Sequence, residues 1–307
     1  MYFLYLCFKF GYQEMKNNIK KIKFKQNAEL QIEVVSLQRL TAANQSDLEL
    51  PHRTDFYHIF LFENCAPTHY VDFEPIVIQP FSLLFIDKDR VHRFDPNLNY
   101  EGLVLIFTDA FFCVREEDTK FLRGGLLFNS LTNESALTLT ELDFQMFANI
   151  FKQIKNELNL PADNATPILL RNLLHNFLLF SEREKRKQGF TDFKKSLDLD
   201  YALLFRDLLE QHYRNLKSVN DYAKMLFVAE KRLGQATSKI LDKSPKQMID
   251  ERVMLEAKRL LSYSSLSIKA ICMQLGFEDP AYFFRFFKKN ALSTPLEFRK
   301  KYGSAIK

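Results

Sequence analysis

The sequence contains four cysteines, and none of them forms a C-x-x-C pair with another. They are Cys7, Cys65, Cys113 and Cys272, scattered over a chain of 307 residues. Zinc fingers and disulfide frameworks need cysteines at short, regular spacings. The spacing therefore excludes both, and it favours a reducing compartment such as the cytoplasm.

The chain also lacks a long hydrophobic segment near its N-terminus. The apolar stretch 1–10 is too short to cross a bilayer, which takes about 20 residues in a helix. It has no basic residues before it and no small-residue cleavage site after it, which argues against a signal peptide. We therefore expect no membrane contact. Met15 opens the basic run 15–21, and we expect it to be the true start, with residues 1–14 as an upstream extension.

The composition is that of a folded protein with an uneven distribution of charge. A chain of this length with 47% hydrophobic and 26% charged residues excludes disorder and fibre, and it favours two domains. Residues 1–199 contain 23 Lys and Arg against 26 Asp and Glu, whereas residues 200–307 contain 20 against 12. A basic C-terminal third is typical of a nucleic-acid-binding module, although a solvated basic surface gives the same count.

Residues 19–108 contain short runs of β-branched and aromatic residues separated by turn-formers. The runs are 32–37, 56–62, 70–73, 76–78, 83–86 and 103–107. Many short strands at close spacing predict a barrel or a sandwich.

The hydrophobic period changes after about residue 140. Apolar residues then recur every three or four positions over 142–158 and again over 169–178, which predicts two amphipathic helices. The following run, 181–189, contains no apolar residue, so we expect a solvated helix end or a linker there.

The last hundred residues have helical periodicity throughout and contain one layout twice. Ser218 is placed to cap a short helix, and a second helix is expected over 230–241. About fifty residues later Ser267 caps another short helix, and Asp279 caps the run 280–290. A helix, a tight turn and a second helix is the arrangement that places the second helix in a DNA major groove. One long helix, about 245–263, lies between the copies.

Four motifs with fixed spacings follow one another in this region. They read Arg252-x-x-x-Glu256-Ala257-x-Arg259-Leu260-Leu261, Ile268-x-x-Ile271-x-x-x-Leu275-Gly276-Phe277-x-Asp279, Tyr282-Phe283-x-Arg285-x-Phe287-Lys288-Lys289 and Thr294-Pro295-x-x-Phe298-Arg299. They resemble the DNA-binding domain of the AraC/XylS family of bacterial transcription regulators. Ala223-x-x-Leu226, Lys231-Arg232-Leu233 and Lys243-Ser244-Pro245 resemble the first helix-turn-helix of that family. Tyr70-x-Asp72-Phe73 and the spacing from Phe85-Ile86 to His92 resemble its cupin-type sensor domain.

The resemblance implies an α+β protein with two domains. Residues 19–187 would form a cupin-like β-barrel with trailing helices, which senses a signal and dimerises. Residues 188–199 would be a linker, and 200–303 an all-α double helix-turn-helix domain. The implied function is sequence-specific regulation of transcription, by activation, without a cofactor. The implied partners are double-stranded DNA, RNA polymerase, a small-molecule effector and a second copy of the chain.

The chain departs from the family pattern where helices begin and end. Asp242 and Leu292 stand where the family has glycine, whose freedom at positive φ suits a helix C-terminus. Either the second turn differs or it is strained at Leu292. Ala229 replaces the usual serine cap of the first recognition helix, which costs about 0.5 to 2 kcal/mol of local stability.

The first recognition helix is expected to bury Leu233, Ala236, Thr237 and Ile240 and to present its other face to DNA. On that face Gln235 can pair with adenine, and Lys231 can reach guanine acceptors or phosphate, with Arg232 and Ser238 beside them. The alternative is that Lys231, Arg232 and Lys239 only form a solvated surface.

The second recognition helix is expected to bury Phe283, Phe286 and Phe287. Ala281, Phe284, Arg285, Lys288 and Lys289 then point toward the groove. We expect Arg285 to contact a base. Phe284 either lies against thymine methyl groups or extends the packing between helices.

A metal-dependent cupin enzyme is the alternative function. His52, His58, His69 and His92 lie in the strand-rich region, but there is no His-x-His motif, and 80–82 lacks the glycine usual in the second cupin motif. We therefore interpret them as ordinary interior histidines and expect no metal. No phosphate-binding loop, kinase motif or Ser-His-Asp set indicates another enzyme class. An effector pocket is expected among the aromatic residues Phe56, Tyr57, Phe60, Tyr70 and Phe85, although half of them must belong to the core.

Overall fold

The computed structural model describes residues 19–303 except for 26–27, 97–99, 129–135 and 191–195. The expected start at Met15 lies outside these described residues. The chain divides into two compact units, one covering the described residues from 20 to 190 and the other covering residue 19 and residues 196–303.

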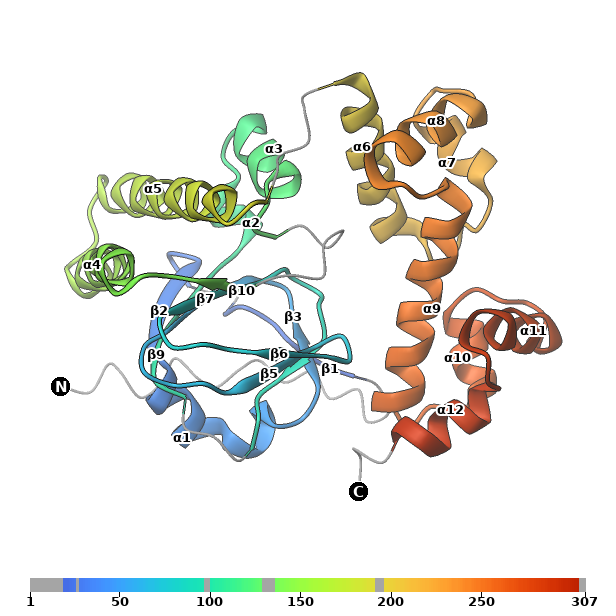
Figure 1. Ribbon diagram of the computed structural model, residues 1–307, viewed down its shortest axis with the longest axis horizontal. Coiled ribbons are helices and arrows are strands. Elements are labelled where there is room, and N and C mark those ends of the chain that lie inside the picture. The colour runs from blue at the N-terminus through green and yellow to red at the C-terminus, as the bar shows by residue number, and fades with distance from the viewer. Residues whose placement is uncertain (1–18, 26–27, 97–99, 129–135, 191–195, 304–307) are drawn as a thin grey trace. The chain divides into compact units, whose positions relative to one another are not determined.

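The N-terminal unit contains two five-stranded sheets (Figure 1). The first has the order β1 (Lys20–Ile22), β3 (His52–Thr54), β8 (His92–Arg93), β5 (Thr68–Val71) and β6 (Glu74–Val77). The second has the order β10 (Ala136–Thr138), β7 (Ser82–Ile86), β4 (Tyr57–Phe62), β9 (Gly102–Phe107) and β2 (Ile32–Ser36). No strand pair among the described residues joins the two sheets, so a closed cupin barrel is not confirmed.

The second sheet is formed by the most hydrophobic runs of the sequence, and both of its faces are covered. All six residues of β4 and all five of β7 are buried. On one face Phe60 packs with residues of the first sheet such as Val71. On the other face Ile59 packs with two helices. A strand buried on both faces needs no alternation of polar and apolar residues, which explains the continuous apolar runs.

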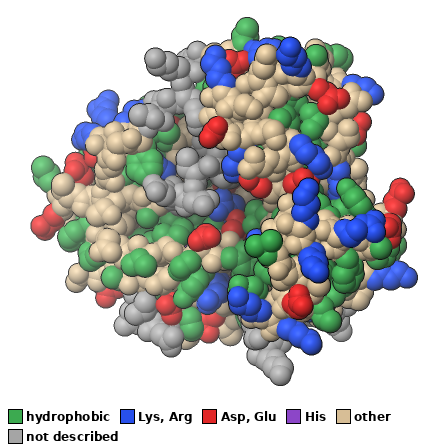
Figure 2. All heavy atoms as spheres, turned by 45° about the vertical axis from the view of Figure 1, so that its right-hand side comes forward, with side chains coloured by type: hydrophobic (Ala, Val, Ile, Leu, Met, Phe, Trp, Pro, Cys, Tyr) green, Lys and Arg blue, Asp and Glu red, His purple; other side chains and the backbone are tan. Residues whose placement is uncertain are grey.

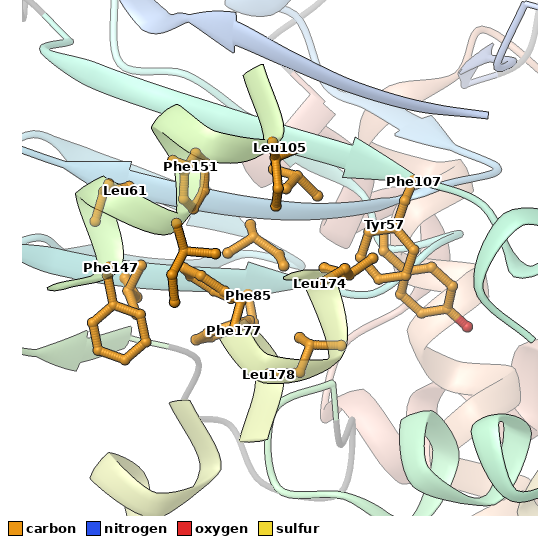
Figure 3. Packing of buried hydrophobic residues seen from close by; sticks show 14 of the residues in the cluster. Tyr57, Leu61, Phe85, Leu105, Phe107, Phe147, Phe151, Leu174, Phe177 and Leu178 are labelled. Atoms are coloured by element: carbon orange, nitrogen blue, oxygen red, sulfur yellow. The ribbon is translucent and has the colours of Figure 1, made fainter. Parts of the chain in front are cut away.

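The two helices predicted after the strands are α4 (Glu141–Asn159) and α5 (Thr166–Lys187). Phe147 and Phe151 of α4 meet the ring of Phe177 of α5 edge to face at 5.0 and 5.1 Å. Figure 3 shows these side chains in the layer between the helices and the sheet, beside Phe85 and Leu105. The helices therefore share one hydrophobic core with the second sheet.

The C-terminal end of α5 differs from the expectation. The run without apolar residues is helical as far as Lys187, and Glu182 and Lys185 are buried rather than solvated. The Lys185 ammonium donates to the Leu126 carbonyl oxygen at 2.9 Å, and Glu182 accepts from the Leu126 amide at 3.2 Å. Burial is tolerated because each charged group has a polar partner.

Three helices in the strand-rich region were not expected. They are α1 (Leu37–Leu48), α2 (Asp109–Phe112) and α3 (Glu116–Gly124). Helix α1 is mostly polar, but Leu37, Leu40 and Leu48 pack against the inner face of the second sheet. The predicted strand over 70–73 ends at Val71, because Asp72 and Phe73 form a turn with positive φ.

The C-terminal unit is entirely helical among its described residues. Its helices are α6 (Leu197–His212), α7 (Val219–Met225), α8 (Glu230–Leu241), α9 (Pro245–Tyr263), α10 (Ile268–Gln274), α11 (Pro280–Ala291) and α12 (Pro295–Tyr302). The predicted helices over 230–241, 245–263 and 280–290 are confirmed. Within the described part of the chain, every helix is too short or too polar to span a membrane.

Candidate nucleic-acid interface

The C-terminal unit contains one arrangement twice: α7 recurs 49 residues later as α10, and α8 and α9 recur fifty residues later as α11 and α12. Helix α8 begins at Glu230 and α11 at Pro280, and both helices are 12 residues long. The helices that follow them, α9 and α12, both begin with proline after a hydroxyl cap, Ser244 and Thr294. Each position on α8 therefore has a counterpart on α11.

The residue that follows each of the equivalent helices α8 and α11 is in the left-handed conformation. Asp242 has φ of 52° and Leu292 has φ of 55°, so the turn does not differ between the copies. This conformation is strained for leucine. The Leu292 side chain is 91% exposed, so packing does not compensate for the strain.

The turns inside the two copies also share a left-handed residue. Gly276 has φ of 72°, and a Cβ there would lie 1.9 Å from the Arg214 carbonyl oxygen. The residue in the same place of the first copy is Phe227, with φ of 56° and a side chain that is 94% exposed. The first turn therefore carries a strained aromatic residue where the second requires glycine.

The start of α8 has no side-chain cap, as Ala229 predicts, and the helix is nevertheless formed. In the second copy the Asp279 carboxylate accepts from the amides of Ala281 and Tyr282 at 2.8 and 3.1 Å. The two recognition helices thus differ in how firmly their first turns are held.

The exposed face of α8 is the one that its periodicity predicts. Leu233, Ala236 and Thr237 are buried, whereas Lys231, Gln235 and Ser238 are exposed. Ile240, also expected inside, is half-buried.

Arg232 does not join the exposed set on α8. Its Nη1 donates to the Asp198 carboxylate of α6, and its guanidinium lies 5.0 Å from the centre of the Tyr201 ring. The Lys239 ammonium donates to the other oxygen of Asp198 at 2.7 Å. Hydrogen bonds from Lys239 and Arg232 lower the pKa of Asp198, so the carboxylate is ionised. The periodicity of α8 does not predict this contact, because Asp198 lies 34 positions away on another helix.

The exposed face of α11 is more basic and more aromatic. Phe283 and Phe287 are buried and Phe286 is half-buried. The residues expected toward the groove, Ala281, Phe284, Arg285, Lys288 and Lys289, are all exposed. Tyr282 is an exposed residue that the periodicity did not single out, and it takes the place of Arg232.

Phe284 packs against its own helix core and is also partly exposed. Its side chain is 39% exposed, and its ring centre lies 6.3 Å from that of Phe283 in an edge-to-face arrangement. It therefore contacts the helix core and still presents an aromatic edge to solvent.

The long helix α9 carries a buried charge network in its middle. The Glu256 carboxylate, 1% exposed, lies 3.1 Å from Arg259 Nη1, 3.5 Å from Arg252 Nη1 and 3.7 Å from Arg214 Nη2. Arg252 Nε also donates to Glu210 of α6 at 2.8 Å. Removing one member of such a network leaves a buried charge without compensation, so these contacts fix α9 against α6.

Positive charge is spread over the surface of these helices. Figure 2, in which the right-hand side of Figure 1 comes forward, shows Lys and Arg side chains interspersed with hydrophobic ones. Such a surface suits a polyanion that also offers apolar groups, as DNA bases do.

Four histidines of the N-terminal unit, His52, His58, His69 and His92, are buried close together. The ring of His92 lies 4.4 Å from that of His52 and 4.8 Å from that of His58, and its Nδ1 is 3.1 Å from His69 Nε2. Burial lowers the pKa of all four, to about 4 for His52 and about 3 for His69. Among the residues with described positions, no group of three His, Cys, Asp or Glu side chains can hold a metal ion.

The aromatic residues expected to line one pocket are separated. Phe56 and Phe60 lie in the inner core, whereas Tyr57 and Phe85 lie on the opposite face of the sheet, beneath α4 and α5. The expectation of a common pocket is wrong because alternate strand residues point to opposite faces. A cavity of about 400 Å³ lies elsewhere, lined by residues that include Gln38, Thr41, Gln45, Glu49, Phe94 and Tyr100.

Comparison with known proteins identifies the C-terminal region. Residues 222–301 match the family model described as helix-turn-helix domain. The uncharacterized HTH-type transcriptional regulator YisR of Bacillus subtilis is 32% identical over 92 residues, which cover 30% of this chain and 32% of YisR. The lactose operon transcription activator of Staphylococcus xylosus is 27% identical over 148 residues, which cover 47% of this chain and 51% of the relative.

The chain thus spans no more than about half the length of these two relatives. Among solved structures, ToxT from Vibrio cholerae is 15% identical and covers 88% of this chain and 94% of its own, with a TM-score of 0.40. The two relatives are named as regulators of transcription. The C-terminal region of the chain, residues 222–301, is therefore a helix-turn-helix domain of the AraC type.

Proposed function

We propose that the chain is a sequence-specific DNA-binding regulator of transcription that reads double-stranded DNA with α8 and α11. The observation that supports this proposal is the duplication itself. Two helices of equal length, fifty residues apart and connected by α9, expose equivalent faces in a basic unit.

The residues on the two faces suit different bases. On α8, Gln235 has the amide that pairs with adenine, and Lys231 and Ser238 lie beside it. On α11, Arg285 has the guanidinium that pairs with guanine, and Phe284 can contact thymine methyl groups. Ala281 is small enough to allow close approach, and Lys288 and Lys289 are suited to phosphates.

The length of α9 is consistent with DNA recognition by both α8 and α11. Its 19 residues span about 28 Å at 1.5 Å per residue. That length can hold two recognition helices about one turn of DNA apart, near 34 Å. Each protomer would then occupy two adjacent major grooves on one side of the duplex.

The N-terminal unit would supply control and self-association. We propose that it is a cupin-like sensor for a small-molecule effector and that α4 and α5 form a dimer contact. Both helices expose large apolar side chains, namely Leu142, Ile168, Leu169 and Leu179, and Leu160 at the end of α4 is exposed as well. The proposal includes activation through RNA polymerase, in the cytoplasm.

Selection of bound fragments from the genome of the source organism tests the proposal. Fluorescence anisotropy with a selected fragment and with a random duplex then gives affinities over a range of salt concentrations. A regulator of this kind binds the selected fragment more tightly, with an affinity that falls steeply with salt. Footprinting should show protection in two adjacent major grooves, and protection of a single groove would contradict the reading by both helices.

A further inference from the structure

Asp198 lies between two cations of the first recognition helix. Its Oδ1 accepts from Arg232 Nη1, and its Oδ2 accepts from Lys239 Nζ at 2.7 Å. The Asp198 side chain is only 14% exposed. Both oxygens of one carboxylate on α6 are therefore engaged by side chains of α8.

The second copy provides an internal comparison. Lys289 occupies on α11 the place that Lys239 occupies on α8, and Tyr282 occupies the place of Arg232. No ion pair within the described portion of the chain involves Lys289. The positive charge of Lys289 on α11 is thus free, whereas that of Lys239 on α8 is partly neutralised by Asp198.

Asp198 affects DNA binding whether Arg232 and Lys239 pair with it or with DNA phosphates. If Arg232 and Lys239 stay on Asp198, they make no phosphate contacts. If they move to phosphates, Asp198 is left as an unpaired negative charge beside a polyanion. In both cases the cluster of three carries a net charge of one rather than two, and the sequence-independent attraction to DNA is weaker.

We propose that Asp198 is a positioning residue that holds Arg232 and Lys239 away from the DNA backbone and so lowers affinity for non-specific DNA. This inference rests on the proposed function. On α8, recognition of bases then depends on Lys231, Gln235 and Ser238. Attraction to the phosphates comes mainly from the cations of α11. Asp198 thereby raises the ratio of specific to non-specific binding.

The first test replaces Asp198 in the full chain. D198N frees both cations, whereas D200N removes an exposed carboxylate two residues away that makes no ion pair among the described residues. The probe is a labelled random-sequence duplex, measured by anisotropy over about 50 to 200 mM salt. D198N should steepen the slope of log affinity against log salt by about 0.9 to 1.8, since each phosphate contact adds about 0.9. An effect of D198N no larger than that of D200N, or weaker binding by D198N, overturns the proposal.

The second test leaves Asp198 in place and stands if D198N proves unstable to heat. K289Q should reduce the salt slope by about 0.9, while K239Q should change it much less, because Lys239 already has a carboxylate partner. Where D198N folds stably, K239Q added to it should reduce the slope as K289Q does in the wild type, which extends the first test. Equal effects of K239Q and K289Q in the wild type contradict the proposal. Failure of the wild type itself to bind any duplex would instead refute the proposed function.

Discussion

Gln235 of α8 and Arg285 of α11 occupy the same position in the two copies, fifty residues apart, and both are exposed. One is a neutral amide that suits adenine and the other a planar cation that suits guanine. A structural duplication has thus kept the helix geometry while the side chains at the equivalent position differ in chemistry. The two halves of the DNA site should accordingly differ in base composition.

Replacement of Arg285 should change specificity, and replacement of Lys288 should change affinity. Arg285→Ala is expected to relax preference at one base position and to cost about 1 to 3 kcal/mol on the selected site, because a bidentate contact to a base is lost. Lys288→Ala should weaken binding to all sequences alike and reduce the salt slope by about 0.9. Anisotropy with a panel of single-base variants of the selected fragment measures both. Equal losses for the two variants on random DNA would count against a base contact by Arg285.

Leu292→Gly should stabilise the C-terminal unit. Leu292 has φ of 55°, a conformation that costs a non-glycine residue about 1 to 2 kcal/mol, and its side chain is 91% exposed. Little packing is lost on replacement, although the greater freedom of glycine in the unfolded chain offsets part of the gain. Thermal unfolding followed by circular dichroism should show a melting temperature a few degrees higher. The exposed Leu296→Gly, in the first turn of α12, is the control and should not raise the melting temperature, since Leu296 is in a right-handed helix where glycine relieves no strain.

The boundaries of α9 and α11 could be predicted from the sequence because local signals mark where these helices begin. Asp279 caps α11, Ser244 caps α9, and prolines occupy their first positions. The inward and outward faces of α8 followed from its period. These signals act between residues three or four positions apart, so no tertiary information was needed.

The rest depends on contacts that sequence periodicity does not contain. Lys185 is buried because it meets the carbonyl oxygen of Leu126, 59 positions away. Arg232 is half-buried because Asp198 of α6 lies beside it. Strand β8 is only two residues long, and neither His92 nor Arg93 predicts a strand. In each case the partner, rather than the residue's own type, determines the environment.

Acidification should destabilise the N-terminal unit. Burial lowers the pKa of His52 to about 4 and of His69 to about 3, from 6.5 in an unfolded chain. As the pH falls from about 7 toward 4, the unfolded chain takes up protons that the folded unit does not, so the free energy of unfolding decreases. Urea denaturation at several pH values measures this.

His58→Phe tests the assignment of that pH dependence to the histidines. His58 Nδ1 has no hydrogen-bond partner, and its ring is stacked 5.6 Å from that of Phe60, so phenylalanine keeps the shape of the side chain. Burial also lowers the pKa of His58. The variant should therefore lose less stability on acidification than the wild type. An equally steep pH dependence in both proteins would show that His58 does not contribute to it.

Replacement of exposed apolar residues on α5 should separate dimers into monomers. Ile168 and Leu169 are 54% and 47% exposed, and lysine there would place two charges in the proposed contact between protomers. Sedimentation equilibrium at micromolar protein should give a dimer for the wild type and a 36.2 kDa species for I168K/L169K. Leu204→Lys, on α6 and 50% exposed, is the matched control and should leave the dimer intact. Because paired half-sites gain from effective concentration, the monomeric variant should also bind a two-site fragment more weakly while keeping its affinity for a single site. A wild-type protein that sediments only as a monomer would contradict the proposed contact.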